Sequence, residues 1–368
     1  MKNSEIKDWL ILRAIPGISD NLYKRLIERF SSPEKVLGAK EDDLAKVPEI
    51  RRDVVRAIVR GREGINISEE LERIKRYKID IITLNDESYS ENLKEIYDPP
   101  PLLYVKGKIK KEDKNAIAIV GSRRATTYGK LTAQKLSAQL AAQGITIVSG
   151  MARGIDSEAH KAALAVGGRT IAVLGCGIDV VYPPENRALE EKIASSGAVI
   201  TEFPFGTRPF AGNFPKRNRI ISGLSLGVVI VEAAEKSGAL ITARFALEQG
   251  REVFAVPGST VSPYSRGTHN LIKEGAKLVE DIDDILEELE SLIQVRKGKG
   301  EEAKGFPKPP LSKEEEIIYN LITQEPKHID ILIQESKLPA QGAMVVLTNL
   351  QIKSLIKELS GKNFVRKR

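Results

Sequence analysis

The sequence contains little of what metal centres and disulfides require, with a single cysteine, Cys176, and three histidines among 368 residues. One cysteine cannot form a disulfide within the chain, and so few Cys and His residues argue against a Cys/His zinc site. A chain without disulfides suits a reducing cytosol. We therefore expect a cytoplasmic protein that holds no metal and no cofactor.

Long apolar runs are also missing, since no stretch approaches the about 20 apolar residues that a membrane-spanning helix needs. The first five residues lead into a charged helix pattern rather than the apolar core of a signal peptide. We expect no contact with a membrane. The net charge of +7 fits an anionic partner such as nucleic acid, although Lys- and Glu-rich chains also carry such an imbalance for solubility alone.

Apolar residues make up 41% of the chain, which is ample for packed cores, and the length predicts two or three domains. The first is expected at residues 1–65, where Leu22, Leu26 and Phe30 recur at helical spacing. The turn at residues 15–19 resembles one helix-hairpin-helix unit, in which a glycine turn offers backbone amides to a DNA phosphate. The second candidate turn, residues 47–50, lacks the glycine. A small SAM-like helical scaffold or dimerisation domain is therefore the competing interpretation.

Residues 66–290 carry the pattern of a Rossmann-like α/β domain. Strands are expected at residues 79–84, 102–105, 116–120, 145–149, 170–174, 198–201, 227–231 and 252–256, with helices between the later ones. Continuous apolar strands that alternate with helices predict a doubly wound, mostly parallel sheet covered on both faces. Such a sheet binds its ligand at the carboxyl ends of its strands.

The remaining residues predict a linker and a third domain. Residues 291–310 have linker composition. Residues 311–368 show helical patterns at 313–322, 329–336 and 339–350 and then a hairpin pattern with its turn at 360–362. Three helices and a hairpin predict a winged-helix-like domain.

The motif Gly121-Ser122-Arg123-Arg124 follows the first strand of the parallel set, where a helix begins. That position turns free backbone amides and a helix N-terminus toward the ligand. Ser122 adds a hydroxyl donor, and Arg123 can hold a phosphate through two hydrogen bonds, which lysine cannot. A tight turn with a solvated arginine is the plainer interpretation, but two arginines at the crevice favour phosphate binding.

Three further loops are expected at the same crevice. The segment 149–156 ends the next strand in the same way, the segment 214–219 combines an aromatic ring with basic residues that suit a single strand, and the segment 237–243 opens another helix. The predicted phosphate-binding residues are Gly121, Ser122, Arg123, Arg124, Ser149, Gly150, Arg153, Phe214, Lys216, Arg217, Asn218, Arg219, Ser237 and Gly238.

Enzymatic motifs are not met by this sequence. The spacing from Gly121 to Lys130 is too long for a P-loop, and Gly175-Cys176-Gly177 lacks the third glycine of a dinucleotide site. No nucleophile–base–orienter set is visible, so we predict no catalytic residue. Glu202, Glu232 and Asp179 are expected to be capping or pairing carboxylates.

These motifs, in this order, resemble the DprA (DNA-processing protein A, or Smf) family. The resemblance covers the central domain from end to end through Gly121-Ser122-Arg123, the motif 149–156, Val173-Leu174-Gly175, Tyr182-Pro183, the motif 214–220, Ser237-Gly238-Ala239-Leu240 and Val256-Pro257-Gly258. It implies a homodimer that binds single-stranded DNA without sequence specificity or nucleotide hydrolysis and helps load RecA recombinase, notably in natural transformation.

The resemblance also implies phosphate contacts from residues 121–123, Phe214, Arg217 and Arg219, and weaker ones from the segment 237–238. Many relatives carry a lysine just upstream of the phenylalanine, whereas this chain has Ala211-Gly212-Asn213 there. Lys216 or Arg208 is expected to replace it.

Two other functions remain open at this point. A LOG-like nucleoside 5'-monophosphate hydrolase uses a similar Rossmann core, but its Pro-Gly-Gly signature is not met here. A regulator of double-stranded DNA would use the winged helix, but the helix expected at 339–350 is poor in Lys and Arg.

Overall fold

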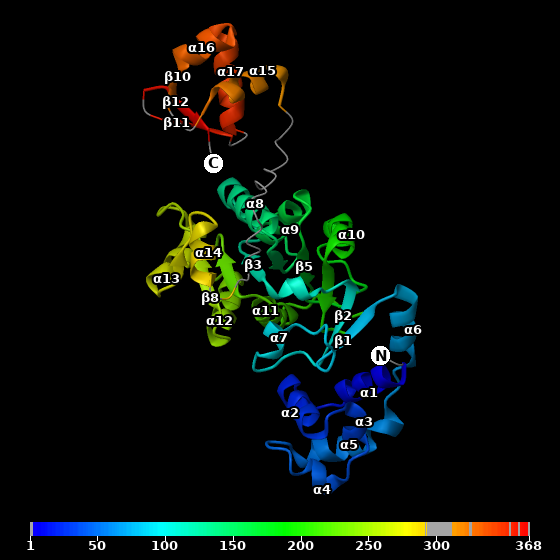
Figure 1. The fold of residues 1–368 in the computed structure, drawn as a ribbon. Helices are drawn as coiled ribbons and strands as arrows, with labels where there is room; N and C mark the ends of the chain where they lie inside the picture. Colours follow the sequence, from blue (N-terminus) through cyan, green and yellow to red (C-terminus); the bar gives the residue numbers. More distant parts are fainter. Residues whose placement is uncertain are drawn as a thin grey trace. The chain divides into compact units, whose positions relative to one another are not determined.

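The computed structural model describes residues 3–290, 292, 311–323, 326–352, 355–359 and 361–366 (Figure 1). Contacts divide the chain into two units, Met1–Lys297 and Gly298–Arg368. The linker expected at residues 291–310 lies outside the described residues, apart from Leu292. No helix of the described part is long and apolar enough to cross a membrane.

The first unit begins with the predicted short helices, and their bounds are α1 Asn3–Ala14, α2 Asp20–Phe30, α3 Pro33–Leu37, α4 Glu41–Leu44 and α5 Arg52–Gly64. The hydroxyl of Ser19 caps α2 by accepting from the amide of Leu22. Gly17, with φ of 88°, makes the turn before α2, and Glu49, with φ of 61°, takes the same left-handed conformation at the second turn. One more helix follows, α6 Ser68–Tyr77. The sequence pattern predicts only strands in residues 66–115.

A nine-stranded sheet forms the centre of this unit and confirms the doubly wound prediction. Its strands run in the order β1-β2-β6-β5-β4-β3-β7-β8-β9, antiparallel between β1, β2 and β6 and parallel elsewhere. Their bounds are β1 Asp80–Thr83, β2 Leu102–Gly107, β3 Ala116–Val120, β4 Thr146–Ser149, β5 Thr170–Val173, β6 Ala198–Thr201, β7 Gly227–Ile230, β8 Glu252–Ala255 and β9 Lys277–Leu278.

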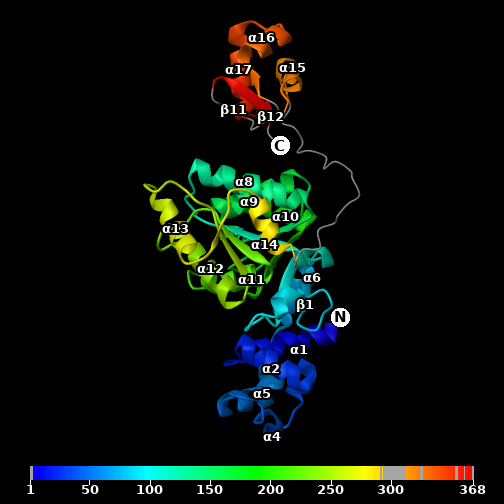
Figure 2. The same ribbon diagram turned by 60° about the vertical axis from the view of Figure 1, so that its left-hand side comes forward.

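Helices cover both faces of the sheet, with α8 and α9 on one face and α11 and α12 on the other (Figure 1, Figure 2). Alternation along β3 explains the two layers, because Ile117 packs with α8 and α9 while Ala118 belongs to the cluster around Ile220 of α11. The helix bounds are α7 Glu91–Lys94, α8 Thr127–Ala142, α9 Ile155–Ala165, α10 Arg187–Ser196, α11 Asn213–Gly223, α12 Ala239–Glu248, α13 Arg266–Lys273 and α14 Asp283–Leu289.

The hydrophobic core runs without a break from the N-terminal helices into the sheet. Trp9 of α1, stacked on Tyr23 at 5.5 Å, belongs to the same buried cluster as Leu102 and Ile220. The N-terminal helices and the sheet are therefore packed as one unit, which the sequence pattern alone does not reveal.

The strand order reverses at β3, which positions the ligand crevice. From β3 the chain builds β4, β5 and β6 to one side and then returns to add β7 and β8 on the other. The loops after β3 and β7 consequently diverge and leave a crevice at the carboxyl ends of these strands.

The second unit is a small α/β domain that agrees with the winged-helix prediction. Its elements are α15 Lys313–Leu321, β10 Lys327–His328, α16 Ile329–Ser336, α17 Ala340–Ile352, β11 Ile356–Leu359 and β12 Asn363–Arg366. The strands form an antiparallel sheet in the order β10-β12-β11.

Candidate nucleic-acid interface

A crevice of about 730 Å³ opens where the strand order reverses. The loop after β3, helix α11 and the start of α12 line it. Of the residues predicted to bind phosphate, it gathers Gly121, Ser122, Arg123, Arg124, Phe214, Arg217, Asn218, Ser237 and Gly238. Three distant segments of the sequence therefore meet at one site, whereas the predicted residues Ser149, Gly150 and Arg153 of the fourth segment do not line it.

The turn after β3 is tightly fixed. A Cβ atom on Gly121 would lie 2.7 Å from Cγ1 of Ile155 and 3.0 Å from the carbonyl oxygen of Glu232, so only glycine fits there. The hydroxyl of Ser122 accepts from the amide of Arg124 at 3.1 Å, which leaves its own proton for another acceptor. Both Arg123 and Arg124 are exposed. The turn thus presents two guanidinium groups and a hydroxyl from a rigid backbone.

The carboxylate of Glu232 holds the helix that follows this turn. It accepts from the amide of Thr126 at 2.9 Å and from the hydroxyl of the same residue. A carboxylate at the start of a helix stabilises the positive end of its dipole. The prediction that Glu232 is a capping group is therefore confirmed.

Phe214 is half-buried, lines the crevice and lies close to two guanidinium groups. The Cζ atoms of Arg123 and Arg217 lie 5.0 and 5.9 Å from its ring centroid. A Cβ atom on Gly175 would lie 2.8 Å from the same ring, and the ring of Tyr182 is tilted against it at 5.6 Å. Phe214 therefore packs against residues from the loops after β3 and β5 and from α11.

The guanidinium group of Arg217 is buried and forms hydrogen bonds with the loops that follow two strands. Arg217 is 4% exposed and donates from Nη1 to the carbonyl oxygens of Gly150, at 2.6 Å, and Val173. Burial lowers the pKa of Arg217 to about 10, and the carboxylate of Asp156 opposes this shift. The guanidinium of Arg217 is thus bound by the loops after β4 and β5 while Arg217 still lines the crevice, and the phosphate contact expected of it stays a prediction.

The segment after β4 supplies structural contacts. The hydroxyl of Ser149 is fully buried and donates to the carbonyl oxygen of Ile119 at 2.6 Å. Ser149 was expected to line the crevice, but its hydroxyl does not reach it. Gly150 lets Arg217 approach, since a Cβ atom there would lie 2.7 Å from its Nη2. Arg153 is exposed and pairs with Glu185, with 3.1 Å from Nη2 to Oε2.

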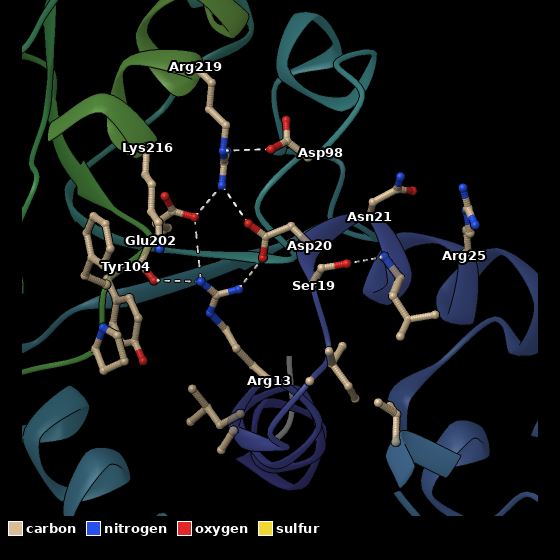
Figure 3. A pocket seen from close by; sticks show the side chains of 18 of the residues that line it. Arg13, Ser19, Asp20, Asn21, Arg25, Asp98, Tyr104, Glu202, Lys216 and Arg219 are labelled. Atoms are coloured by element: carbon tan, nitrogen blue, oxygen red, sulfur yellow. Dashed lines mark hydrogen bonds and ion pairs between the residues drawn. The ribbon is translucent and has the colours of Figure 1, made fainter. Parts of the chain in front are cut away.

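Arg219 and Lys216 do not line this crevice. They line a separate cavity of about 930 Å³ between the N-terminal helices and the sheet (Figure 3). Successive residues of an α-helix are about 100° apart, so Arg217 and Arg219 project in nearly opposite directions from α11. The prediction that Arg219 contacts phosphate at this crevice is therefore wrong, and Lys216 does not replace the missing lysine there.

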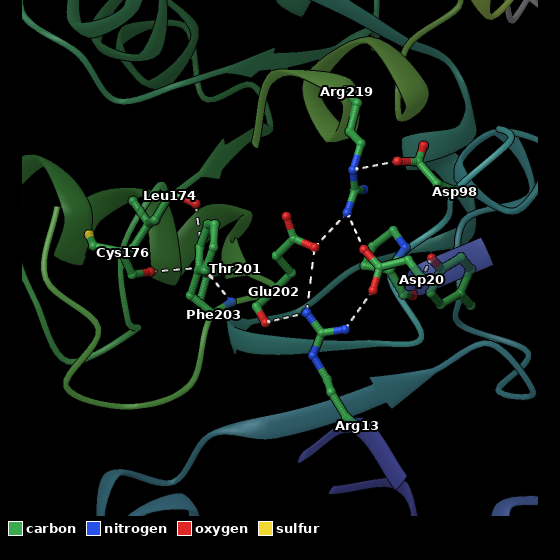
Figure 4. A network of polar contacts seen from close by, with 11 residues as sticks. Arg13, Asp20, Asp98, Leu174, Cys176, Thr201, Glu202, Phe203 and Arg219 are labelled. Carbon is green, nitrogen blue, oxygen red and sulfur yellow. Dashed lines mark hydrogen bonds and ion pairs between the residues drawn. The ribbon is translucent and has the colours of Figure 1, made fainter. Parts of the chain in front are cut away.

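Arg219 instead joins a buried cluster of charges (Figure 4). Its Nη2 lies 2.6 Å from Oδ2 of Asp20 and 2.5 Å from Oε2 of Glu202, and its Nε lies 3.2 Å from Oδ2 of Asp98. Arg13 of α1 pairs with the same Asp20 at 2.7 Å. This cluster links the N-terminal helices to α11, and it confirms Glu202 as a pairing carboxylate.

Two crevice residues were missed at the sequence level. Lys236 is exposed and lines the crevice directly before the predicted Ser237, so its position next to a candidate anion site was the available signal. Tyr182, which is 37% exposed, lines the crevice from the loop after β5. The motif Tyr182-Pro183 did not indicate that the tyrosine side chain would line the crevice.

Two side chains of reactive type, those of His160 and Cys176, are buried in this unit. His160 is fully buried, its Nδ1 lies 2.6 Å from Oγ1 of Thr170, and burial lowers its pKa to about 3. Burial raises the pKa of the Cys176 thiol to about 11. Within the part of the chain that the structure describes, no three His, Cys, Asp or Glu side chains group as metal ligands would.

Two family models match the sequence of this chain. The model of DNA recombination-mediator protein A matches residues 80–290, and that of the DprA winged helix domain matches residues 302–362. Protein Smf of Synechocystis is 34% identical over the whole of both chains. The DNA processing protein DprA of Bacillus subtilis is 43% identical over 65% of this chain and 82% of its own length.

Solved structures agree with these matches. The X-ray structure of DNA processing protein A from Streptococcus pneumoniae has a TM-score of 0.68 and 36% identity over 78% of this chain and 98% of its own. The structure of DNA processing protein A from Helicobacter pylori, which describes its single-stranded DNA binding mode, has a TM-score of 0.52 and 33% identity over 58% of this chain and 96% of its own.

Proposed function

The chain belongs to the DprA family of DNA recombination-mediator proteins, and we propose that it binds single-stranded DNA at the crevice beside α11, without sequence specificity. The observation that carries this proposal is the convergence of exposed cations beside the glycine turn after β3. Arg123, Arg124 and Lys236 line the crevice and are exposed. The turn at Gly121 and the start of α12 line the same crevice.

These groups suit a DNA backbone because guanidinium, ammonium and amide donors bind phosphate without reading a base. Binding at this crevice would therefore be independent of sequence. From the family we further propose that the protein helps load RecA on the bound strand during transformation or recombination, and that it acts as a homodimer in the cytoplasm.

Nucleotide hydrolysis is not part of the proposal. The candidate carboxylate of a LOG-like hydrolase, Glu232, is 3% exposed and is bound to Thr126. Incubation with AMP is expected to release no free adenine. Turnover that is lost in Glu232→Gln would overturn the non-enzymatic assignment.

The test is the salt dependence of binding to a dT oligomer. Each neutralised phosphate of a single strand contributes about −0.7 to the slope of log K against log salt, so three exposed cations predict a slope near −2. Arg123→Ala should weaken binding and flatten the slope by about 0.7. Arg56→Ala, at another exposed position, on α5, serves as the control and should change neither quantity.

Two outcomes would contradict the proposal. Absence of measurable binding to the dT oligomer at low salt would remove the function. Unchanged affinity and slope in Arg123→Ala would remove the site, since the guanidinium closest to Phe214 would then contact no phosphate.

A further inference from the structure

The loop after β4 is a second place at this crevice where a strand ends and a helix begins. Strand β4 pairs with β3 in the sheet, and Ala152 and Asp156 line the crevice beside the turn after β3. Loops of this kind offer backbone amides and the positive end of a helix dipole to phosphate. Two neighbouring strand ends would therefore each bind phosphate, unless one of them is already occupied.

The carboxylate of Asp156 occupies the loop after β4. Its Oδ2 accepts from the amide of Ala152 at 3.3 Å, and the carboxylate also accepts from the amide of Gly150. Met151, which lies between these two residues, has a left-handed φ of 61°. Such a residue turns the amides on either side of it toward a common point, which is the arrangement that binds anions.

Buried hydrogen bonds fix this loop. The amide of Asn186 donates from Nδ2 to the carbonyl oxygen of Met151 at 3.0 Å and to Oγ of Ser157 at 2.8 Å. The hydroxyl of Ser157 donates to the carbonyl oxygen of Ala152 at 2.6 Å. Asn186 is 8% exposed and Ser157 is 5% exposed. The left-handed residue is thus held from outside the loop, and the two amides keep their direction without help from Asp156.

The carboxylate also lies near buried positive charge. Asp156 is 6% exposed and Arg217 is 4% exposed. Burial raises the pKa of Asp156, and Arg217, the two amides and Arg123 oppose this shift. A phosphate in this loop would meet the same guanidinium groups and the same amides. Asp156 therefore satisfies, from within the chain, the donors that a bound anion would otherwise use.

We propose that the carboxylate of Asp156 is a built-in anion that takes the place of a ligand phosphate in the loop after β4, and that it thereby excludes inorganic phosphate and free mononucleotides. The inference rests on the proposed binding of single-stranded DNA and makes Asp156 a residue that determines its specificity. A mononucleotide depends on close contacts to one phosphate, whereas a strand sums weaker contacts over several phosphates. Filling this loop consequently favours the strand.

The test is calorimetric titration with inorganic phosphate at constant ionic strength. Asp156→Ala removes the carboxylate and opens the loop to the crevice. It should bind phosphate saturably and about 10-fold or more tightly than the unmodified protein, the effect of one hydrogen bond to a charged group. Asp156→Asn keeps the volume and one acceptor oxygen, so it should gain nothing. Glu158→Ala is the matched control, because it removes a negative charge from the same first turn of α9 at a residue that does not line the crevice.

A second variant and a second measurement cover a failure of Asp156→Ala to fold. Asp156→Ser is smaller than aspartate and uncharged, and its hydroxyl can still accept from the amide of Ala152. It should gain phosphate binding as Asp156→Ala does. Phosphate should also raise the thermal midpoint of either variant more than chloride does at equal ionic strength, because a ligand that binds only the folded state stabilises it. The midpoints of the unmodified protein and of Glu158→Ala should not distinguish the two salts.

Three outcomes would overturn the inference. Equal phosphate affinity in the unmodified protein and in both smaller variants would show that the loop is no anion site. An equal gain in Glu158→Ala would show a general effect of net charge. A gain in Asp156→Asn as large as in Asp156→Ala would show that the carboxylate repels phosphate without occupying its place. These titrations contain no DNA, so they stand apart from the proposed function, which fails instead if the unmodified protein does not bind the dT oligomer.

Discussion

Replacing Arg219 by methionine should lower the free energy of unfolding by about 3–5 kcal/mol, the cost of leaving a buried charge without its partner. Arg219 is 5% exposed and Glu202 is 3% exposed, and 2.5 Å separates their closest charged atoms. Methionine fills a similar volume without charge. Glu202 would then retain Arg13, at 3.6 Å, as its nearest cation.

The assay is urea unfolding followed by the fluorescence of Trp9. This residue is the only tryptophan in the sequence and lies buried in α1, so it reports on the helices that Asp20 belongs to. Arg153→Met serves as the control, because it removes a pair whose side chains are 62% and 51% exposed. Exposed pairs contribute little to stability, so no measurable change is expected.

The decrease in the free energy of unfolding caused by Arg219→Met should become smaller as the pH falls. Burial raises the pKa of Glu202, with Arg219 opposing the shift. A carboxyl with a raised pKa in the folded state destabilises the protein fully above that pKa and no longer does so below its unfolded value of about 4.3. Without Arg219, the cost of burying the charged Glu202 carboxylate is larger at neutral pH, and protonation of Glu202 at lower pH removes that cost. A loss below about 1 kcal/mol, or one that does not change between neutral pH and about pH 4, would refute the reasoning.

Three further predictions concern the residues around the crevice. Between pH 6.5 and about 3, the unfolded chain protonates His160 but the folded protein does not, so the free energy of unfolding falls as the pH is lowered. His160→Gln should make this fall less steep, and urea unfolding across the same pH range measures it. Gly154→Ala should lower the thermal midpoint and cost about 1–3 kcal/mol, because Gly154 has φ of 77° and a Cβ atom would lie 2.3 Å from the carbonyl oxygen of Ser122; an unchanged midpoint would contradict this. Cys176 should react with a thiol reagent about 100-fold more slowly than free cysteine at mildly alkaline pH, as its pKa of about 11 against 9.0 implies, and reaction at the free rate would show that the thiol is exposed.

Much of the fold follows from local patterns in the sequence. The strand expected at residues 116–120 and the one found, Ala116–Val120, coincide, because continuous apolar residues mark a strand that is buried on both faces. Helix α6 was not expected, although Leu71 and Ile74 have helical spacing. Its surface is so rich in charged residues that the short apolar face is easily overlooked.

The site was predicted less completely, and Arg219 shows why. The segment 214–219 was assigned to the crevice as a block, on its density of basic residues. Helical geometry could have separated Arg217 from Arg219, since both lie in the same helix two positions apart. The carboxylates that bind Arg219 could not have been found this way, because Asp20, Asp98 and Glu202 come from three distant segments.

The rotation of helix α11 about its own axis is therefore fixed by contacts with two different parts of the protein. Arg217 is tied to the loops after β4 and β5, and Arg219 to carboxylates near the N-terminal helices. Inserting or deleting one residue between them would rotate one arginine by about 100° about the helix axis relative to the other. One of the two would then leave its partners, so we expect the length of this segment to be invariant even where its side chains vary.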